Sequence, residues 1–293
     1  MRTQGKFGRL AVALVAVACM AGSAVLAQQL AMEPLKDSGS NIYPAYEGWY
    51  KNDDGTFTLL IGYYNRNKKE VIDIPIGPDN KIEPGPGDRG QPTHFFPSRN
   101  RYWFRVPVAA DFGSKELVWT LTAHGKTERA YATLNPNYAI DRSVEQLDTA
   151  GINLWWAEEG VNKPPTVRVD GESRRRVKVG EPLPLAAIVA DDGVPPSPKV
   201  AERRGRYAWY GLRVAWFIDR GAGRVTFAPV QFKVYPDPAG NSPWTPGWTA
   251  PPVPPDHKYP VTVTFQDQGE YVVRVMAHDG GLATTADVQV SVQ

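Results

Sequence analysis

Six residues of this chain have the glycine spacing of a nucleotide phosphate loop. Residues 85–90 read G-P-G-D-R-G, which satisfies the pattern G-x-G-x-x-G. A dinucleotide loop of this kind follows a buried parallel strand and opens a helix whose backbone amides face the pyrophosphate. Pro86 has no amide to donate and the chain continues as an extended Q-P-T segment, so the match is accidental. We expect a rigid surface turn that presents Asp88, Arg89 and Gln91, either for recognition or simply to solvent.

Other residue types that often do chemistry are scattered along the chain. The four histidines occur singly, without H-x-x-x-H or H-E-x-x-H metal spacing, and there is no G-x-S-x-G nucleophile motif. We therefore expect no catalytic residue. A carboxylate pair brought together by folding would still allow a secreted hydrolase, so that alternative stays open.

Calcium is the one cofactor that the carboxylates suggest. Asp191, Asp192 and Asp279 lie in D-D-G and D-G sequences at the ends of expected strands, and Asp219 and Asp267 occupy similar positions. Hard oxygen ligands from neighbouring loops could converge there on one ion. Asp-Gly also builds turns with no metal, and this simpler interpretation leads us to expect no cofactor.

Residues 236–260 form a proline-rich insertion with large aromatic side chains. Proline at this density disfavours a central strand and favours polyproline II geometry, while Trp244, Trp248 and Tyr259 offer broad apolar faces. The aromatics either fold back over the rest of the protein or bind a protein or glycan partner. We take these three side chains as tentative binding residues.

Residues 261–279 predict two strands around a turn. Val261, Val263 and Phe265 alternate into Gly269, and Tyr271 begins a second alternation that ends at an aspartate. The pattern F-x3-G-x-Y-x-V-x-V-x-A-x-D resembles the end of a polycystic kidney disease (PKD) domain or a related immunoglobulin-like domain. The resemblance implies a β-sandwich that binds, spaces or displays rather than catalyses.

The resemblance extends over residues 164–293. Strands are expected at 166–169, 185–189, 212–216, 225–227 and 288–292, and Trp216 is the large core aromatic that such a sandwich requires. One departure lies at 216–221, which reads W-F-I-D-R-G where a PKD domain has W-x-F-G-D-G. Charge runs at 174–176 and 203–206 are expected in loops.

A second β-sandwich is expected at residues 43–136. Strands are predicted at 57–65, at 72–76 and at 102–108, and a hairpin at 117–134 turns at His124-Gly125. Residues 137–163 form a linker with at most one short helix near 143–149, and Trp155-Trp156 are expected at the junction. The fold class is thus all-β, with two immunoglobulin-like β-sandwich domains.

The N-terminus reads as an export signal. A basic stretch precedes the apolar residues 10–20, and Val25-Leu26-Ala27 suits a signal peptidase, so residues 1–27 are predicted to be removed. Residues 28–42 would then be a flexible mature N-terminus. Cys19, the one cysteine, allows the alternative of a lipid-anchored protein. The expected location is periplasmic or extracellular.

The net charge of the mature chain bears on which class of partner it binds. Cleavage removes three basic residues and no acidic one, so the formal net charge falls from +2 to −1. Nucleic acids and anionic membranes need a concentrated cationic face, which this balance does not favour. We expect an exported, non-catalytic binding or assembly protein of the bacterial envelope or extracellular space that contacts another protein. The alternatives are carbohydrate binding by the aromatic insertion and, third, a secreted hydrolase.

Overall fold

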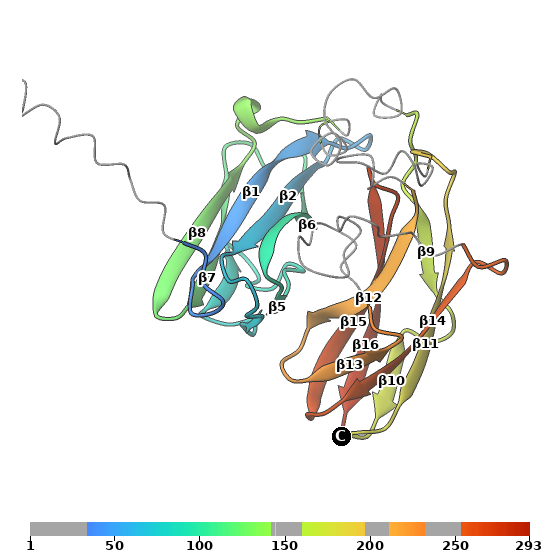
Figure 1. Ribbon diagram of the computed structural model, residues 1–293. Helices are drawn as coiled ribbons and strands as arrows, with labels where there is room; N and C mark the ends of the chain where they lie inside the picture. Colours follow the sequence, from blue (N-terminus) through green and yellow to red (C-terminus); the bar gives the residue numbers. More distant parts are fainter. Residues whose placement is uncertain (1–33, 142–143, 145–159, 197–210, 232–252) are drawn as a thin grey trace, which may run out of the picture. The chain divides into compact units, whose positions relative to one another are not determined.

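The computed structural model describes residues 34–141, 144, 160–196, 211–231 and 253–293 (Figure 1). Its elements are β-strands and one 3-10 helix, η1 (Pro136–Tyr138), so the all-β prediction is confirmed. All of these elements lie in one unit, residues 36–293. No helix among the described residues is long and apolar enough to span a bilayer.

The first half of the chain contributes antiparallel sheets in the orders β1-β2-β6, β4-β7-β8 and β3-β5. Their strands are β1 (Ile42–Lys51), β2 (Phe57–Asn65), β3 (Ile72–Asp73), β4 (Asn80–Glu83), β5 (His94–Phe95), β6 (Ser98–Val108), β7 (Glu116–Ala123) and β8 (Lys126–Thr133). Strand β6 is an edge strand, because β2 is its one neighbour in the described sheet.

A hydrophobic cluster lies between the two larger sheets of this half. Leu59 of β2 and Phe104 of β6 are buried on one side, and Trp119 of β7 on the other. The rings of Phe104 and Trp119 meet edge-on with centroids 5.1 Å apart, a favoured aromatic geometry. The indole N–H of Trp119 donates to Oδ1 of buried Asn80 at 3.0 Å, which satisfies both polar groups. The two sheets therefore form a sandwich.

The second half forms another sandwich, with sheet orders β10-β16-β15-β12 and β13-β14-β11-β9. Its strands are β9 (Thr166–Val169), β10 (Arg174–Val177), β11 (Leu183–Ala190), β12 (Arg213–Arg220), β13 (Val225–Ala228), β14 (Lys258–Phe265), β15 (Gly269–His278) and β16 (Ala283–Val292). A separate cluster of buried side chains from both sheets fills this sandwich.

Trp216 and Tyr271 are both buried in this second cluster, as the sequence predicts, each 2% exposed. The Tyr271 ring packs on Phe265 with centroids 4.7 Å apart. Its hydroxyl lies 2.8 Å from the carbonyl oxygen of Ala222 and 3.0 Å from that of Asp267. A tyrosine hydroxyl that bonds back to the preceding turn in this way is a feature of immunoglobulin-like sandwiches.

The prediction that residues 174–176 form a loop is wrong. Arg174–Val177 is strand β10, which pairs parallel with β16 at the edge of its sheet. Arg174 and Arg176 are exposed, Arg175 is half-buried, and Val177 enters the core. Charged side chains on an edge strand prevent pairing with another chain, which is why a charge run is compatible with a strand here.

The predicted insertion at 236–260 ends earlier than the sequence indicates. Lys258 already begins β14, so Tyr259 and Pro260 belong to a strand. Pro260 is tolerated because β14 pairs with β13 only from Thr262 onward, which leaves one side of the strand without a ladder at that point.

Several predicted features lie outside the described residues. These are the signal peptide with Cys19, the short helix at 143–149 except residue 144, Trp155-Trp156, the charge run at 203–206, and both tryptophans of the insertion. The predicted domain boundaries stay predictions.

Candidate binding cleft and adjoining contacts

Strand β6 carries a bulge at residues 101–103. Ile61 pairs with Phe104 and Tyr63 pairs with Asn100, so Gly62 alone stands opposite three residues. A Cβ on Gly62 would collide with the carbonyl oxygen of Asn100, so this close approach requires glycine. A bulge re-aims the side chains of its strand and is frequent beside functional sites.

The bulge leaves Tyr102 in the left-handed region, with φ of 49°. This conformation is uncommon for a residue with a side chain and persists only where the surrounding structure holds it. Trp103 and Phe104 are consequently both buried, and Tyr102 is only half-buried. In the strand expected at 102–108, Phe104, Val106 and Val108 alternate into the core, and the bulge removes Tyr102 from that alternation.

The bulged part of β6 forms one wall of a cleft of about 300 Å³. Arg101, Tyr102 and Arg105 line this wall, and Arg274 and Met276 of β15 line the opposite one. No carboxylate belongs to the described lining, whereas three arginines do. The cleft has the size of a small-ligand site, and its described lining is rich in arginine.

His278 also lines the cleft but is fixed in its neutral form. Burial and, to a smaller extent, the charge of Arg213 together lower the pKa of His278 to about 3. Its Nδ1 accepts a hydrogen bond from the Gly280 amide at 2.8 Å. This nitrogen is already used by the backbone, so His278 is poorly placed to act as a general base.

Arg274 belongs to a partly buried ion-pair network beside the cleft. Its guanidinium donates to Asp219 at 2.7 Å and to both carboxylate oxygens of Asp287, at 2.7 and 2.8 Å. Burial raises the pKa of Asp219, and the positive charge of Arg274 opposes that shift. The indole N–H of Trp103 reaches Asp219 as well, at 3.3 Å.

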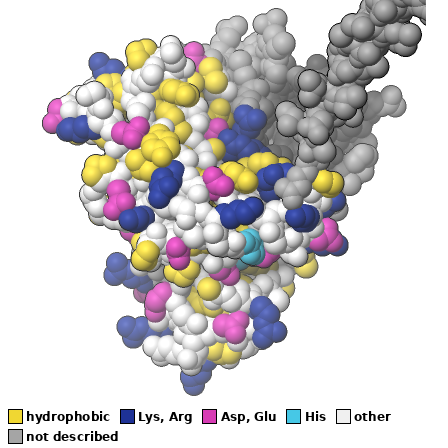
Figure 2. All heavy atoms as spheres, turned by 90° about the vertical axis from the view of Figure 1, so that its left-hand side faces the viewer, with side chains coloured by type: hydrophobic (Ala, Val, Ile, Leu, Met, Phe, Trp, Pro, Cys, Tyr) yellow, Lys and Arg dark blue, Asp and Glu magenta, His cyan; other side chains and the backbone are white. Residues whose placement is uncertain are grey.

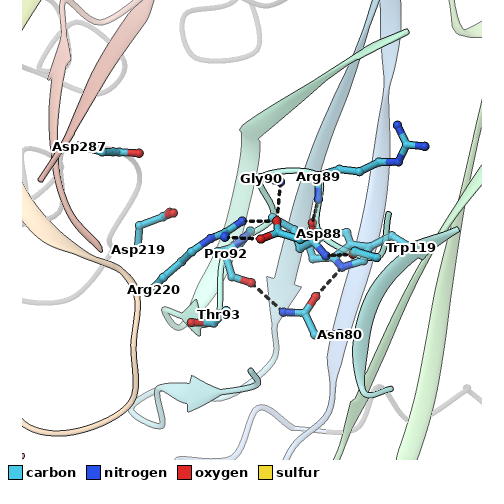
Figure 3. Close-up of polar contacts among 12 residues, drawn as sticks. Asn80, Asp88, Arg89, Gly90, Pro92, Thr93, Trp119, Asp219, Arg220 and Asp287 are labelled. Atoms are coloured by element: carbon cyan, nitrogen blue, oxygen red, sulfur yellow. Dashed lines mark hydrogen bonds and ion pairs between the residues drawn. The ribbon is translucent and has the colours of Figure 1, made fainter. Parts of the chain in front are cut away.

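The loop of residues 85–90 contacts β12 through a bidentate ion pair. Both oxygens of Asp88 accept from the Arg220 guanidinium at 2.8 Å, and Figure 3 shows the two side chains pointing at one another. This bonding to Arg220 lowers the pKa of Asp88. Nearby, the Thr93 amide donates to the carbonyl oxygen of Asp219, and the Thr93 hydroxyl accepts from the Gly221 amide.

Aromatic side chains form a second part of the contact between β12 and the first half of the chain. Phe217 of β12 packs against Trp103 and Phe96, with ring centroids 5.3 and 5.8 Å apart. Phe217 therefore joins the cluster of the first half although its strand belongs to the second. Polar and aromatic contacts together hold β12 against β5 and β6.

We expect the Asp88–Arg220 pair to stabilise this contact modestly. A double-mutant cycle with Asp88→Asn and Arg220→Gln should give a coupling free energy of about 1 kcal/mol, because bidentate geometry offsets solvent screening at a partly exposed site. Urea denaturation of the four proteins measures it. The exposed Lys69–Asp37 pair is the control and should show no measurable coupling. Equal coupling in both cycles would contradict a specific role for Asp88.

The structure places the other tentative binding residues as follows. Arg89 donates to the carbonyl oxygen of Pro84, and Gln91 is fully buried, where it accepts from the Arg89 amide and donates to the carbonyl oxygen of Gly87. Both brace their own loop. Tyr259 is half-buried in β14 and packs against the second core. Partner binding by these residues stays a prediction.

The calcium candidates lie in two turns. Asp192 accepts from the amides of Lys163 and Val194, and one oxygen of Asp279 accepts from two backbone amides at 2.6 and 2.7 Å. Asp191 accepts from the Gly193 amide. The described residues contain no group of three or more His, Cys, Asp or Glu side chains suited to a metal ion. Calcium binding stays untested.

Arg101, Arg105 and Arg274 line the cleft but were not predicted as site residues from the sequence. The sequence did contain one indication of the bulge. Y-W-F places three successive aromatic residues in a strand, whereas strict alternation would bury only every second one. Nothing in the sequence near either strand indicates that β6 and β15 line the same cleft.

Comparison with known proteins gives only distant structural similarity. No protein-family model matches the sequence, and no curated protein matches it either. The solved structures that it resembles include the Sidekick-1 immunoglobulin domains 1–4, at 12% identity over 88% of this chain and 51% of that one, with a TM-score of 0.23.

Two further solved structures match to a similar degree. The Clostridium thermocellum CbhA fibronectin(III)-like modules match at 12% identity over 86% of this chain and 94% of that one, with a TM-score of 0.23. Domains 4 and 5 of the S-layer protein SbsC match at 13% identity over 86% and 98%, with a TM-score of 0.22. At these scores the similarity supports no conclusion on function.

Proposed function

We propose that this chain is an exported, non-catalytic binding protein of the bacterial envelope or extracellular space that acts through contacts with another protein. The composition of the cleft carries the proposal. Its described lining combines arginines with apolar side chains and contains no carboxylate and no nucleophile activated by a base. Such a lining suits binding rather than proton transfer.

The side chains in and beside the cleft that could act as a general acid or base are held in other interactions. His278 is buried in its neutral form, and the carboxylates beside the cleft, Asp219 and Asp287, are bonded to Arg274. General acid–base catalysis needs a titratable group that reaches the substrate with a pKa near the working pH. His278 is held in its neutral form, and the two carboxylates lie outside the described lining of the cleft, which favours the binding proposal over a hydrolase.

Surface charge favours a protein partner. Basic and acidic side chains are interspersed over the face drawn in Figure 2, with hydrophobic ones among them. A polyanion such as nucleic acid is bound by a surface of one sign. Within this proposal the second sandwich is a PKD-type display module.

A pull-down from envelope and culture fractions tests the proposal, with residues 237–252 replaced by a Gly-Ser linker as a second bait. We propose that this segment is the principal contact surface, because its prolines limit the entropy lost on binding and its tryptophans supply apolar area. The replacement should reduce partner recovery at least about tenfold. It keeps residues 253–258, since the His257 carbonyl accepts from Val189 of β11.

Circular dichroism is the folding control for that replacement. Undiminished recovery by the folded replacement would move the contact surface elsewhere, and no partner for the wild type would contradict the proposed function. Glycan-array binding that is lost in Trp244→Ala and Trp248→Ala would instead support carbohydrate recognition.

A further inference from the structure

Another hollow lies on the second sandwich, at the edge strand β10. It has a volume of about 490 Å³, within the range of small-ligand sites. Strands β10, β16 and β15 are neighbours in the sheet that carries it (Figure 1). Every side chain of its described lining is polar or charged, and the lining consists of Glu172, Arg174, Arg175, Arg176, Glu270, Gln289 and Ser291.

The strand register brings these side chains to one face of the sheet. Arg174 pairs with Gln289 of β16. Arg176 pairs with Ser291, which in turn pairs with Glu270 of β15. Arg174 and Arg176 are both exposed and lie two positions apart, so they share one face at a spacing of about 7 Å. Their long side chains can therefore converge on one carboxylate.

The charges of these two arginines are not paired with a carboxylate of the described residues. Nε of Arg174 donates to Oε1 of Gln289 at 3.2 Å, which orients the guanidinium group and leaves its terminal nitrogens for another acceptor. The Arg176 side chain makes no hydrogen bond or ion pair with the described residues. Arg175, by contrast, pairs with Glu172 at 3.5 Å. A ligand that complements Arg174 and Arg176 carries negative charge.

The carboxylates of the same hollow argue against a bare anion. Glu172 and Glu270 repel phosphate or sulfate at short range. An ionised carboxylate only accepts hydrogen bonds, so it favours a ligand that also has donors. Oε1 of Glu270 accepts from the Ser291 hydroxyl at 2.7 Å, which leaves Oε2 for a further donor. A ligand that joins one carboxylate to several hydroxyl groups satisfies both requirements, and a uronic acid has this chemistry.

We propose that this hollow binds an acidic saccharide, whose carboxylate lies between Arg174 and Arg176 and whose ring hydroxyls bond to Glu270 and to the amide of Gln289. The site is separate from the proline-rich insertion and needs none of its tryptophans. The inference therefore goes beyond the proposed function, because it gives the chain a polysaccharide ligand in addition to a protein partner.

The test is isothermal titration calorimetry of the mature chain with trigalacturonate. Binding should be measurable and should weaken with added salt. Fully methyl-esterified trigalacturonate keeps the rings and hydroxyl groups but has no charge. It should bind at least about tenfold more weakly, because it cannot form charge-assisted hydrogen bonds to the arginines. The Arg174→Ala/Arg176→Ala variant should bind trigalacturonate at least about tenfold more weakly for the same reason.

The matched control variant is Lys126→Ala/Arg129→Ala, which removes the same charge from exposed positions of β8. It should bind like the wild type. Glu270→Ala distinguishes a saccharide from a bare anion. Loss of an acceptor for a hydroxyl group should weaken trigalacturonate binding at least about threefold, whereas relief of charge repulsion alone would strengthen it.

Four results would overturn the inference. They are absence of trigalacturonate binding, equal weakening in the two double variants, stronger binding by Glu270→Ala, and binding of polyglutamate as tight as that of trigalacturonate. The last result would make the hollow a site for acidic peptides. Each of them leaves the pull-down unaffected, so failure of this inference is distinguishable from failure of the proposed function.

Discussion

Replacing Trp216 or Tyr271 by alanine should lower the free energy of unfolding of the second sandwich by about 3 to 5 kcal/mol. Both side chains are 2% exposed and contact the same cluster, so truncation removes a large apolar area and leaves a cavity. Urea denaturation followed by circular dichroism measures the change. A loss below about 1 kcal/mol in either variant would contradict a core role for that side chain.

Tyr271→Phe separates the ring from the hydroxyl in this prediction. It keeps the contact with Phe265 and removes only the hydrogen bonds to Ala222 and Asp267, so it should cost about 1 kcal/mol of unfolding free energy.

Gly221→Ala tests the packing of the Tyr271 ring against the preceding turn. Gly221 has φ of 116°, and an added Cβ would collide with the Tyr271 ring, so this small substitution should be strongly destabilising.

The sequence predicted those parts of the fold in which the alternation of apolar and polar side chains along a strand decides which of them are buried. Strands 57–65 and 166–169 have the predicted bounds, and the core positions of Trp216 and Tyr271 follow from period-2 patterns around glycine turns. Burial of alternate side chains requires no knowledge of the distant neighbour. It requires only that one face of the strand be covered.

The sequence did not predict features that depend on distant partners. The Asp88–Arg220 pair joins residues 132 positions apart, and neither residue has a neighbour in sequence that identifies the other. The bulge at 101–103 depends on Gly62 of the neighbouring strand. Strand β10 needs β16, because three arginines alone suggest a solvated loop. The cleft combines this bulge with side chains of β15, which is distant in sequence, and its residues were missed for that reason.

The neighbours His278 and Asp279 should have opposite effects on the pH dependence of stability. Both are buried, and burial lowers the pKa of His278 to about 3 and raises that of Asp279 to about 7. These values include a smaller contribution from the charge of Arg213 on β12 to the first shift and from the charge of Asp191 to the second. Each group therefore favours its neutral form in the folded state.

The two shifts give slopes of opposite sign. His278 binds its proton less readily in the folded than in the unfolded chain, so its contribution to stability is present above about pH 6.5 and is lost as the pH falls toward 3. Asp279 holds its proton more readily when folded. Its contribution is present below about pH 4 and is lost as the pH rises through 7. Between about pH 4 and 6.5 the two slopes nearly cancel, so the sum of the two contributions changes little with pH.

Single substitutions should reveal each slope. Asp279→Asn keeps an oxygen for the amides of Gly281 and Leu282, and its stability relative to the wild type should increase by about 4 kcal/mol from pH 4 to pH 7. His278→Asn keeps an acceptor for the Gly280 amide. Its stability relative to the wild type should increase by about 3 kcal/mol as the pH falls from 6.5 to 4.

Urea denaturation at several pH values measures both differences, and the double variant serves as the control. Because the two slopes cancel in the wild type between pH 4 and 6.5, the double variant should follow the wild-type pH profile there although its absolute stability differs. Profiles of the single variants that run parallel to the wild type would show that these groups titrate alike in the folded and unfolded chain. Slopes of the same sign in both single variants would contradict the opposite shifts that burial imposes on an acid and a base.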